Sequence, residues 1–599
     1  MGTTIIDFYK KNISSLEVEL QLLRKKISAF YLLRIFSFLL FFTFFLLYLN
    51  SNYTFYWIAA SAILFATFIF AVARDIKLNK HKKFLLNKLQ INLNEIKFLN
   101  HDYSEFDNGE KFSSINPHLA DDFNLFGRFS LFQYLNRCST LAAKKILAER
   151  LSFPTISKEK ILENQEAIKE LSQKQDFMHT FRAHGLFIEE TGKEINNLKL
   201  WINENPEKTG FLKFLCYFLP ALNIAWIISA SFGIIGFNSI ALPLIISLIF
   251  IFLFFRKVNK AHAKLSRVAK TFNKYNALIN LIEKEEFKSE MLSNLQKNLS
   301  ANGISAGKSL NKLFVLLENF DKRLNVFTAI ILNAFLVFDL QIYRSLIIWK
   351  QKNKDVFENW FITMNEFEVL IGFSTYKFNN SNTTSFPTVV EGNFEINAVA
   401  MGHPLIKPEE RICNDFNFSG KPKTIIVTGA NMAGKSTFLR TVSVNLILAM
   451  NGMPVCAKEM RFLPCEILSS IKIQDSLSDK QSYFYSELLR IKQIIDKVKT
   501  GSPNIVILDE ILRGTNTKDK QLGSTGLLEK LISLKAVVII ATHDLSLGDL
   551  EQKYPETVIN KCFEVELEND RLVFDYKLKS GVSKKLNASF LMQKMELFG

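Results

Sequence analysis

The sequence predicts a chain of three parts: two transmembrane helical hairpins, an all-α helical core with a lever, and a C-terminal α/β domain. The first observation is that apolar runs long enough to cross a bilayer occur in two closely spaced pairs. The second is a helical spacing of apolar residues in much of the remaining sequence before residue 386. The third is a change after residue 386 to short β-branched strands that alternate with helices.

Length, charge and cysteine content limit the number of domains and the kinds of ligand that the protein can bind. The 599 residues leave room for about three or four domains. A net charge of +16, from 74 Lys and Arg against 58 Asp and Glu, favours an anionic partner: nucleic acid, acidic lipid headgroups or both. The 6 cysteines lie far apart without a CxxC spacing. Neither a zinc site nor a disulfide framework is therefore predicted, and a reducing cytosol suits these thiols.

The first apolar pair lies near the N-terminus. Residues 1–28 are predicted to form an N-terminal cytoplasmic helix, and residues 29–73 a transmembrane hairpin. Its spans cover 29–49 and 55–73, each close to the roughly 20 residues that a bilayer requires. Only Arg34 interrupts the first span, near enough to its end to snorkel to the surface.

The second apolar pair interrupts the predicted helical core. A helical linker is expected over residues 74–115, and the first part of the core over 116–210. The second hairpin then covers residues 211–256, with spans at 214–235 and 237–255. Pro residues inside these spans would kink the helices without preventing a crossing.

Positive charge sets the orientation of both hairpins, because Lys and Arg collect on cytoplasmic flanks. The chain is thus predicted to be an integral membrane protein, in the cytoplasmic (inner) membrane if bacterial, with everything outside the hairpins in the cytoplasm. The alternative is that the apolar runs are buried helices of a large soluble core. The flanking basic residues are Arg24, Lys25, Lys26, Arg74, Lys77, Lys80, Lys82, Lys83, Lys213, Arg256, Lys257 and Lys260.

Residues 257–385 are predicted to form the lever and the second part of the core. The charged stretch 259–299 reads either as an extended, lever-like arm or as a plain solvated helix. The apolar stretch 326–349 is expected to be a buried core helix and not a span, because Asp339 and Arg344 interrupt it. A fifth span would also place the C-terminal domain outside the cell.

The C-terminal domain, residues 386–599, contains a glycine-bounded loop between a buried strand and a helix. Gly429 and Gly434 stand at the spacing GxxxxGKS, so that backbone N–H groups and the helix N-terminus can surround phosphates. Lys435 is expected to reach the β and γ phosphates, and Ser436 to ligate magnesium. The pattern therefore predicts a P-loop domain that binds ATP with Mg2+.

Two further strands end in polar residues. The strand "NIVILDE" ends in Asp509, which suits the magnesium shell, and in Glu510, which is placed to orient or deprotonate the attacking water. The strand "AVVIIATHD" delivers His543 at its carboxyl end, where ligands of open α/β sheets bind. His543 is expected to sense the γ phosphate, although a lone histidine is more often structural.

These segments resemble the MutS family, the ABC-class ATPases known for DNA mismatch repair. The loop "TGANMAGKST" is similar to that family's Walker A, in which the pair Asn431 and Met432 is distinctive. The resemblance implies that this pair and Thr437 also contact the nucleotide. Ala430 and Ala433 stand where the family usually has Pro and Gly.

Other segments extend the resemblance. "LDEILRGTNTKD" resembles the family's Walker B and the loop after it, with Lys520 where Gly is usual, and "ATHD" resembles its His switch. "SDKQSYFYSEL" resembles the signature segment and implies that Ser482 is offered to the γ phosphate of a second subunit. "DDFNLFGRFSLFQYLNRCST" resembles the start of the family's helical core. The likeness runs from about residue 116 to residue 599, apart from the second hairpin.

The resemblance implies a membrane-anchored, α/β P-loop ABC-type ATPase that dimerises around two ATP molecules. It also implies double-stranded DNA as a partner, without mismatch reading, because the first hairpin and its linker occupy the place of the mismatch-reading domain. The rival interpretations are a membrane-tethered scaffold that binds nucleotide without turnover, and an ATP-driven clamp on a protein partner. A transport path is disfavoured by the scarcity of polar residues in the spans.

Overall fold

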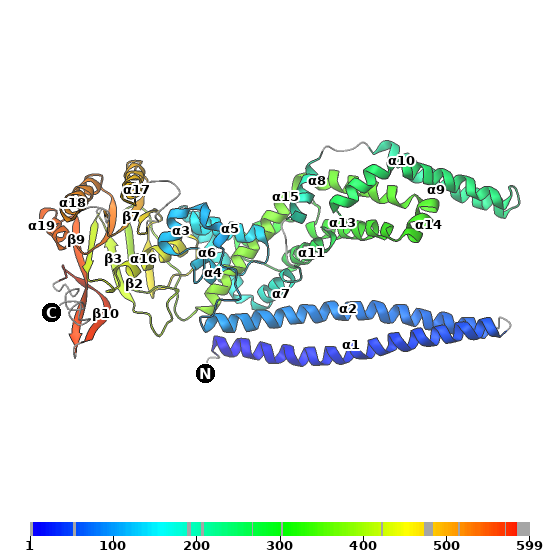
Figure 1. Ribbon diagram of the computed structural model, residues 1–599, viewed down its shortest axis with the longest axis horizontal. Helices are drawn as coiled ribbons and strands as arrows, with labels where there is room; N and C mark the ends of the chain where they lie inside the picture. The colour runs from blue at the N-terminus through cyan, green and yellow to red at the C-terminus, as the bar shows by residue number, and fades with distance from the viewer. Residues whose placement is uncertain are drawn as a thin grey trace.

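A computed structural model describes residues 4–51, 55–188, 193–204, 209–265, 268–300, 303–420, 423–472, 483–512, 516–568 and 571–583. The molecule is elongated, with the C-terminal α/β domain at one end and both predicted hairpins extending toward the other (Figure 1). A helical core lies between them. The core helices are α3 (Pro117–Phe123), α4 (Leu131–Leu135), α5 (Leu141–Ser152), α6 (Lys158–Gln173), α7 (Gln175–Gly185), α8 (Lys193–Asn203), α11 (Val268–Lys284), α12 (Glu290–Asn298), α13 (Ala306–Asp321) and α15 (Phe338–Asn379).

The first hairpin consists of two long antiparallel helices, α1 (Ile5–Asn50) and α2 (Phe55–Leu99), which run side by side (Figure 1). A capping box starts α1: the Thr4 hydroxyl accepts from the Asp7 N–H, and the Asp7 carboxylate accepts from the Thr4 N–H. Neither helix breaks at the predicted boundaries after residues 28 and 73. The predicted N-terminal helix and the first part of the predicted linker are therefore continuous with the predicted spans.

A buried carboxylate joins the base of this hairpin to the core. Glu95 of α2 is fully buried and accepts from Arg137 at 2.7 Å and from Arg182 at 2.6 Å. The Asn379 amide donates to Glu95 at 2.7 Å and accepts from the Tyr9 hydroxyl at 2.7 Å. The ion pairs offset the cost of burying the carboxylate, so α1, α2, α7 and the end of α15 are held in one arrangement.

The second hairpin is formed by α9 (Gly210–Ser231) and α10 (Ala241–Leu265). In the part of the chain that the structure describes, four helices are long and apolar enough to cross a membrane, and these two supply two of them. The others are α1 and α2. The positions agree with the two predicted apolar pairs; whether the helices span a bilayer stays a prediction.

The prediction of one buried helix over 326–349 is wrong. The chain forms a short helix, α14 (Val326–Leu336), and turns by 80° into α15 at Val337, whose φ is 46°. The start of α15 is buried, but α14 exposes an apolar face, with Phe327 81% exposed. Neither Gly nor Pro marks the break; Asn333 stabilises it by accepting from the N–H of Asp339 at 2.9 Å.

The stretch 259–299 is neither an extended arm nor a solvated helix, which corrects both predictions for it. After α10 the chain continues as two separate helices, α11 and α12, and Phe272, Tyr275 and Leu278 are fully buried in the core. These apolar side chains recur at helical spacing and pack inward. The long helix of the core is α15, with 42 residues.

Two sheets build the C-terminal domain within the described residues. One has the strand order β1-β5-β2-β3, and the other β10-β9-β4-β8-β7-β6. In the larger sheet β6, β7, β8, β4 and β9 are parallel, and β10 is antiparallel to β9. The elements are β1 (Thr388–Val389), β2 (Glu395–Met401), β3 (Asn414–Ser419), β4 (Thr424–Gly429), α16 (Lys435–Met450), β5 (Glu459–Phe462), β6 (Glu466–Ser470), α17 (Tyr483–Val498), β7 (Asn504–Asp509), α18 (Thr517–Ser533), β8 (Val537–Thr542), α19 (Leu550–Lys553), β9 (Val558–Glu568) and β10 (Arg571–Ser580).

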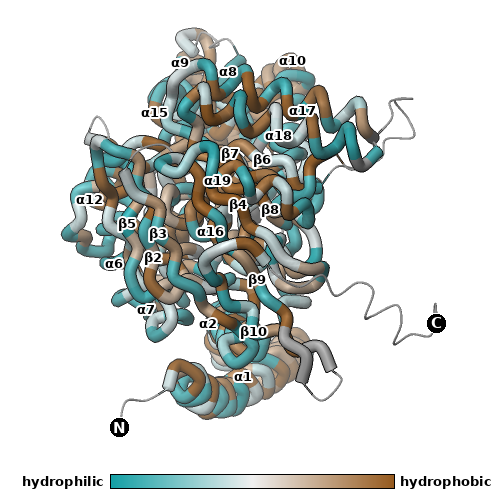
Figure 2. The backbone as a smooth tube through the Cα atoms, turned by 90° about the vertical axis from the view of Figure 1, so that its left-hand side faces the viewer, coloured by the Kyte–Doolittle hydropathy of each residue, from teal (hydrophilic) through white to brown (hydrophobic). Residues whose placement is uncertain are grey.

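Helices cover both faces of the larger sheet, which explains why its central strands are continuous apolar runs. Ile425 and Val427 of β4 belong to the core on the α16 side, while Ile426 packs into the cluster formed with α17 and α18. Figure 2 shows these apolar strands at the centre of the domain, between α16 and the pair α17 and α18. The mixed α/β architecture predicted for this part of the chain is confirmed.

Candidate functional site

The loop between β4 and α16 is shaped by two glycines. Gly429 has φ 153°, and a Cβ there would lie 2.7 Å from the Phe563 carbonyl oxygen. Gly434 has φ 103°, a left-handed conformation that favours glycine, and a Cβ would lie 3.1 Å from the Tyr576 ring. Any side chain at Gly429 would push β9 away from the loop, so the turn requires both glycines.

Lys435 begins α16 and folds back over the loop. Its ammonium donates to the Gly429 carbonyl at 2.8 Å and to the Ala430 carbonyl at 2.9 Å, and it lies 3.2 Å from His543 Nδ1. The residue is buried, so these acceptors replace the water that a charged group would otherwise need. A positive charge is therefore held at the start of a helix, where the helix dipole also attracts anions.

His543 links this lysine to Glu510. Its Nε2 contacts the Glu510 carboxylate, while its Nδ1 faces the Lys435 ammonium. A carboxylate only accepts, so Nε2 donates to Glu510, while Nδ1 lies 3.0 Å from the Gly429 carbonyl oxygen as well as 3.2 Å from the ammonium. The sequence prediction placed these three residues at the ends of separate strands and loops, and the structure brings them together.

The backbone around the site is strained. Met432 in the loop has φ 66°, and Glu510 and Leu512 after β7 have φ 48° and 60°. Such left-handed non-glycine residues persist only where surrounding contacts hold them. For Leu512 the holding contact is Glu487 of α17, whose buried carboxylate accepts from the Leu512 N–H at 2.6 Å. Glu487 lies in the segment "SDKQSYFYSEL", but its contact with Leu512 was not predicted.

A cavity of about 510 Å³ opens beside the loop, lined by Asn431, Met432, Lys435, Ser436 and Thr437 among others. Its far side is lined by residues that were not predicted: Met401, His403, Ile406, Glu410, Ile412, Asn414, Phe563 and Tyr576. The mixture of apolar walls and a cationic loop suits a molecule with a flat apolar part and an anionic part.

His403 is one of the titratable groups of the far wall, and its pKa is shifted. Burial, with the guanidinium groups of Arg411 and Arg440 nearby, lowers the pKa of His403 to about 4. The imidazole is therefore neutral at pH 7, and a neutral ring tolerates an apolar ligand beside it. His403 lies in the segment "MGHPLI", and its place at the cavity was not predicted from the sequence.

The predicted magnesium ligands lie in different surroundings. Ser436 lines the cavity, whereas Asp509 is buried at the end of β7, immediately before Glu510, and does not line it. A hydroxyl and a carboxylate are oxygen donors of the kind that Mg2+ takes, with phosphate and water completing its shell. Among the described residues, no group of three or more His, Cys, Asp or Glu is placed to hold a metal by itself.

The remaining positions singled out from the sequence are Ser482, Ala430, Ala433 and Lys520. Ser482 lies outside the described residues. Ala430 and Ala433, the departures from the family's loop, are accommodated: Ala433 is buried and lacks a positive φ, so a Cβ is tolerated there. Lys520 lies on α18 and does not line the cavity.

A second buried carboxylate joins the helical core to this domain. Asp122 of α3 accepts from the Ser469 hydroxyl at 2.7 Å and from the Lys472 N–H at 2.7 Å, and it pairs with the Arg490 guanidinium of α17. Its own carbonyl accepts from Arg440 of α16 at 2.9 Å. Asp122 of the core thus contacts three elements of the C-terminal domain: β6, α16 and α17.

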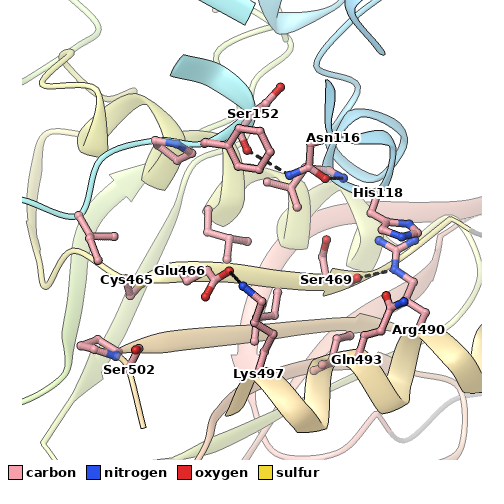
Figure 3. Close-up of a pocket in the computed structure, with 18 residues that line it drawn as sticks. Asn116, His118, Ser152, Cys465, Glu466, Ser469, Arg490, Gln493, Lys497 and Ser502 are labelled. Atoms are coloured by element: carbon pink, nitrogen blue, oxygen red, sulfur yellow. Dashed lines mark hydrogen bonds and ion pairs between the residues drawn. The ribbon is translucent and has the colours of Figure 1, made fainter. Parts of the chain in front are cut away.

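Figure 3 shows the surroundings of this joint, a largely apolar cavity of about 470 Å³. Arg490 donates to the Ser469 carbonyl at 2.7 Å along one wall, and Lys497 pairs with Glu466 at 2.8 Å. Asn116, from the core, lies on the opposite wall (Figure 3). The two parts of the molecule therefore meet across polar contacts at one end of an otherwise apolar cleft.

Comparison with known proteins places the likeness in the C-terminal domain. Residues 425–596 match the family described as MutS domain V. The DNA mismatch repair protein MutS of Thermotoga neapolitana is 32% identical over 203 residues, which cover 33% of this chain and 25% of that protein. MutS protein homolog 4 of Homo sapiens is 31% identical over 195 residues, which cover 31% of this chain and 20% of that protein.

A third relative gives the same picture. The DNA mismatch repair protein MSH3 of Vanderwaltozyma polyspora is 34% identical over 219 residues, which cover 35% of this chain and 21% of that protein. The matches thus span about a fifth to a quarter of these relatives. They support the predicted resemblance to the MutS family for the ATPase-type region; the resemblance of the helical core stays a prediction.

Replacing Asp122 by alanine should destabilise the joint, because Arg490 would be left buried without its carboxylate. Removing one partner of a buried ion pair typically costs about 3–5 kcal/mol. We expect the melting temperature of the purified full-length protein in detergent to fall by several degrees. Asp121→Ala, the same change at the half-buried neighbouring position, is the control, and an equal fall for both would contradict the assignment.

Proposed function

We propose that this protein is a membrane-anchored, MutS-like ATPase that binds and hydrolyses ATP at the interface of a homodimer. The observation that carries the proposal is the contact chain Lys435–His543–Glu510 at the mouth of a glycine-shaped loop. It has an ammonium and a carboxylate on either side of one imidazole, which supports phosphate binding by the first and activation of water by the second. The matches to MutS domain V and to MutS relatives support the same activity.

The loop would bind the phosphates of ATP. Lys435 gives up its carbonyl acceptors for phosphate oxygens, and the N-terminus of α16 adds its N–H groups. Mg2+, held by Ser436 and Asp509, would neutralise charge that builds up on the phosphates. The apolar far wall with the neutral His403 ring would take the base.

Glu510 would act on the attacking water. In the described arrangement its carboxylate accepts from His543. Binding of a γ phosphate near Lys435 would draw His543 toward the new anion and leave the carboxylate of Glu510 for water. This exchange of partners explains why a histidine stands between the two groups.

The dimer is proposed from the resemblance and from an exposed side chain. Met432 is 81% exposed at the rim of the cavity, which is unusual for an apolar residue on a strained loop. A second copy that offers Ser482 to the γ phosphate would cover it. In this arrangement each site is complete only when two copies meet.

Membrane anchoring is proposed from the two hairpins. Each consists of two helices that are long and apolar enough to cross a bilayer, and each is flanked by basic residues on the side of its base. Large apolar side chains are exposed over much of their length, such as Phe252 at 76%. Water is a poor solvent for such a surface, and acyl chains are a good one.

Double-stranded DNA is the partner that the relatives' names favour, since two of those cited are named DNA mismatch repair proteins. Part of the net charge of +16 flanks the hairpins and is explained by lipid headgroups. We therefore propose contacts to phosphates that do not read mismatches. A clamp on a protein partner remains the alternative outcome of the test.

Glu510→Gln should lower the rate of ATP hydrolysis about a hundredfold or more, because it removes the general base. Nucleotide binding should persist, whereas Lys435→Ala should weaken binding itself. Turnover of ATP and binding of a fluorescent ATP analogue separate the two effects. Glu529→Gln, the same change on α18 away from the cavity, is the control. If Glu510→Gln matches its rate, Glu510 is not the general base; if the unaltered protein binds the analogue but does not hydrolyse ATP, it is a nucleotide-binding scaffold instead.

Cysteine labelling of intact cells tests the topology. In a Cys413→Ser background, a cysteine at Ser51 or Asn238, which lie at the turns of the hairpins, should react with a membrane-impermeant maleimide. A cysteine at Asn116 should react only after the cells are opened. The reverse pattern would exclude the proposed orientation, and reaction at all three positions in opened cells only would exclude a crossing.

Titration with homoduplex and mismatched DNA tests the partner. Phosphate contacts predict equal affinity for both duplexes, and a logarithm of affinity that falls linearly with the logarithm of salt concentration. Fluorescence anisotropy of labelled DNA measures both. A preference for the mismatch would refute recognition through phosphates alone, and no binding at low salt would favour a protein partner.

A further inference from the structure

The short helix α14 carries an apolar face that the proposed function does not explain. Residues 326–336 contain no Asp, Glu, Lys or Arg. Phe327, Ile330, Ile331 and Phe335 are all exposed, and their spacing of three and four places them on one side of the helix. Thr328, Ala329 and Leu332, on the opposite side, are half-buried, and Asn333 and Ala334 near the C-terminal end of the helix are buried.

α14 packs against α9, α10 and the start of α15. Figure 1 shows it beside α9, at the end of the molecule toward which both hairpins extend. Its exposed face therefore continues the exposed apolar surface of the second hairpin, where Ile224, Ile245 and Phe252 are exposed. α14 therefore contacts both helices of the proposed membrane anchor directly.

Backbone carbonyl groups at the C-terminal end of α14 accept hydrogen bonds from a side chain of the proposed anchor. The last carbonyls of a helix have no partner within it and are normally hydrated. Here the Asn223 amide of α9, which is buried, donates to the Ala334 carbonyl at 2.9 Å and to the Phe335 carbonyl at 3.0 Å. It also donates to the buried Ser247 hydroxyl of α10 at 3.1 Å. Internal partners of this kind are what a helix end requires where water is absent.

Charges stand only at the base of α14. Arg323, just before it, pairs with Asp339, just after it, at 3.1 Å. This ion pair joins the segment before α14 to the segment after it. With 11 residues, α14 is about 16 Å long, roughly half of the hydrocarbon thickness, so by itself it is too short to span.

We propose that α14 is an additional membrane-inserted element that lies in the cytoplasmic leaflet, with its exposed face against acyl chains and its buried face docked on α9 and α10. This inference rests on the proposed membrane anchoring. The occupant of the apolar face is lipid, because that face continues the surface of the anchor and bears no charge. The bend at Val337 then lets α15 leave the bilayer toward the C-terminal domain.

Fluorescence quenching in vesicles tests the inference. Single cysteines replace Phe327 or Ile331 in the full-length Cys413→Ser protein, and each carries an environment-sensitive fluorophore. Phe252→Cys on α10 is the matched control for a position in lipid. Val399→Cys on β2 is the control for a position in water. The protein is reconstituted into vesicles of phosphatidylcholine and phosphatidylglycerol, with or without brominated acyl chains. We expect brominated lipid to quench the labels at Phe327 and Ile331 as strongly as the label at Phe252, and iodide to quench only the label at Val399.

Each other outcome has a distinct meaning. If brominated lipid quenches at Phe252 but iodide quenches at Phe327 and Ile331, α14 lies in water, and this inference is overturned while the anchoring stands. If neither quencher reaches Phe327 and Ile331, a protein surface covers α14, which also overturns it. If brominated lipid quenches at none of the positions, the membrane anchoring itself fails.

Discussion

The hydrogen bonds and the ion pair of one buried carboxylate, Asp122, hold the helical core and the C-terminal domain together. Asp122 belongs to a helix of only 7 residues, too short to be stable by itself, and its side chain is fully buried. Such an anion is tolerated only if donors surround it. The donors come from β6, from the turn after it and from α17, all in the C-terminal domain. These contacts to Asp122 fix the position of the C-terminal domain on the core.

Glu95 meets the same requirement at the other side of the core. Two guanidinium groups and one amide surround its carboxylate, and these come from segments far apart in the sequence. Apolar packing alone tolerates small shifts, whereas a buried ion pair with several hydrogen bonds fixes direction as well as distance. The core is thus attached to the first hairpin and to the C-terminal domain by directional contacts, with the long helix α15 between them.

Local features of the sequence were predictable, and long-range ones were not. The glycine loop, the apolar strands and the apolar hairpins are contiguous patterns, so their physical causes can be recognised within about twenty residues. Asp122 and Arg490 are 368 positions apart, and nothing near either residue identifies the other as its partner. The bend at Val337 was missed because Asn333, and not Gly or Pro, stabilises it. His403 and Tyr576 reach the cavity only through the folding of β2, β3 and β10 around the loop.

The unbroken helices of the first hairpin have a geometric consequence for any dimer. α1 has 46 residues and is about 69 Å long, more than twice the thickness of the hydrocarbon layer. In the proposed arrangement these rods, fixed to the core through Glu95, hold the C-terminal domain at a constant height above the bilayer. Two copies in one membrane then share that height and that orientation, so a two-fold axis that relates them must run along the membrane normal. Whatever the dimer encloses would then lie around an axis perpendicular to the membrane surface.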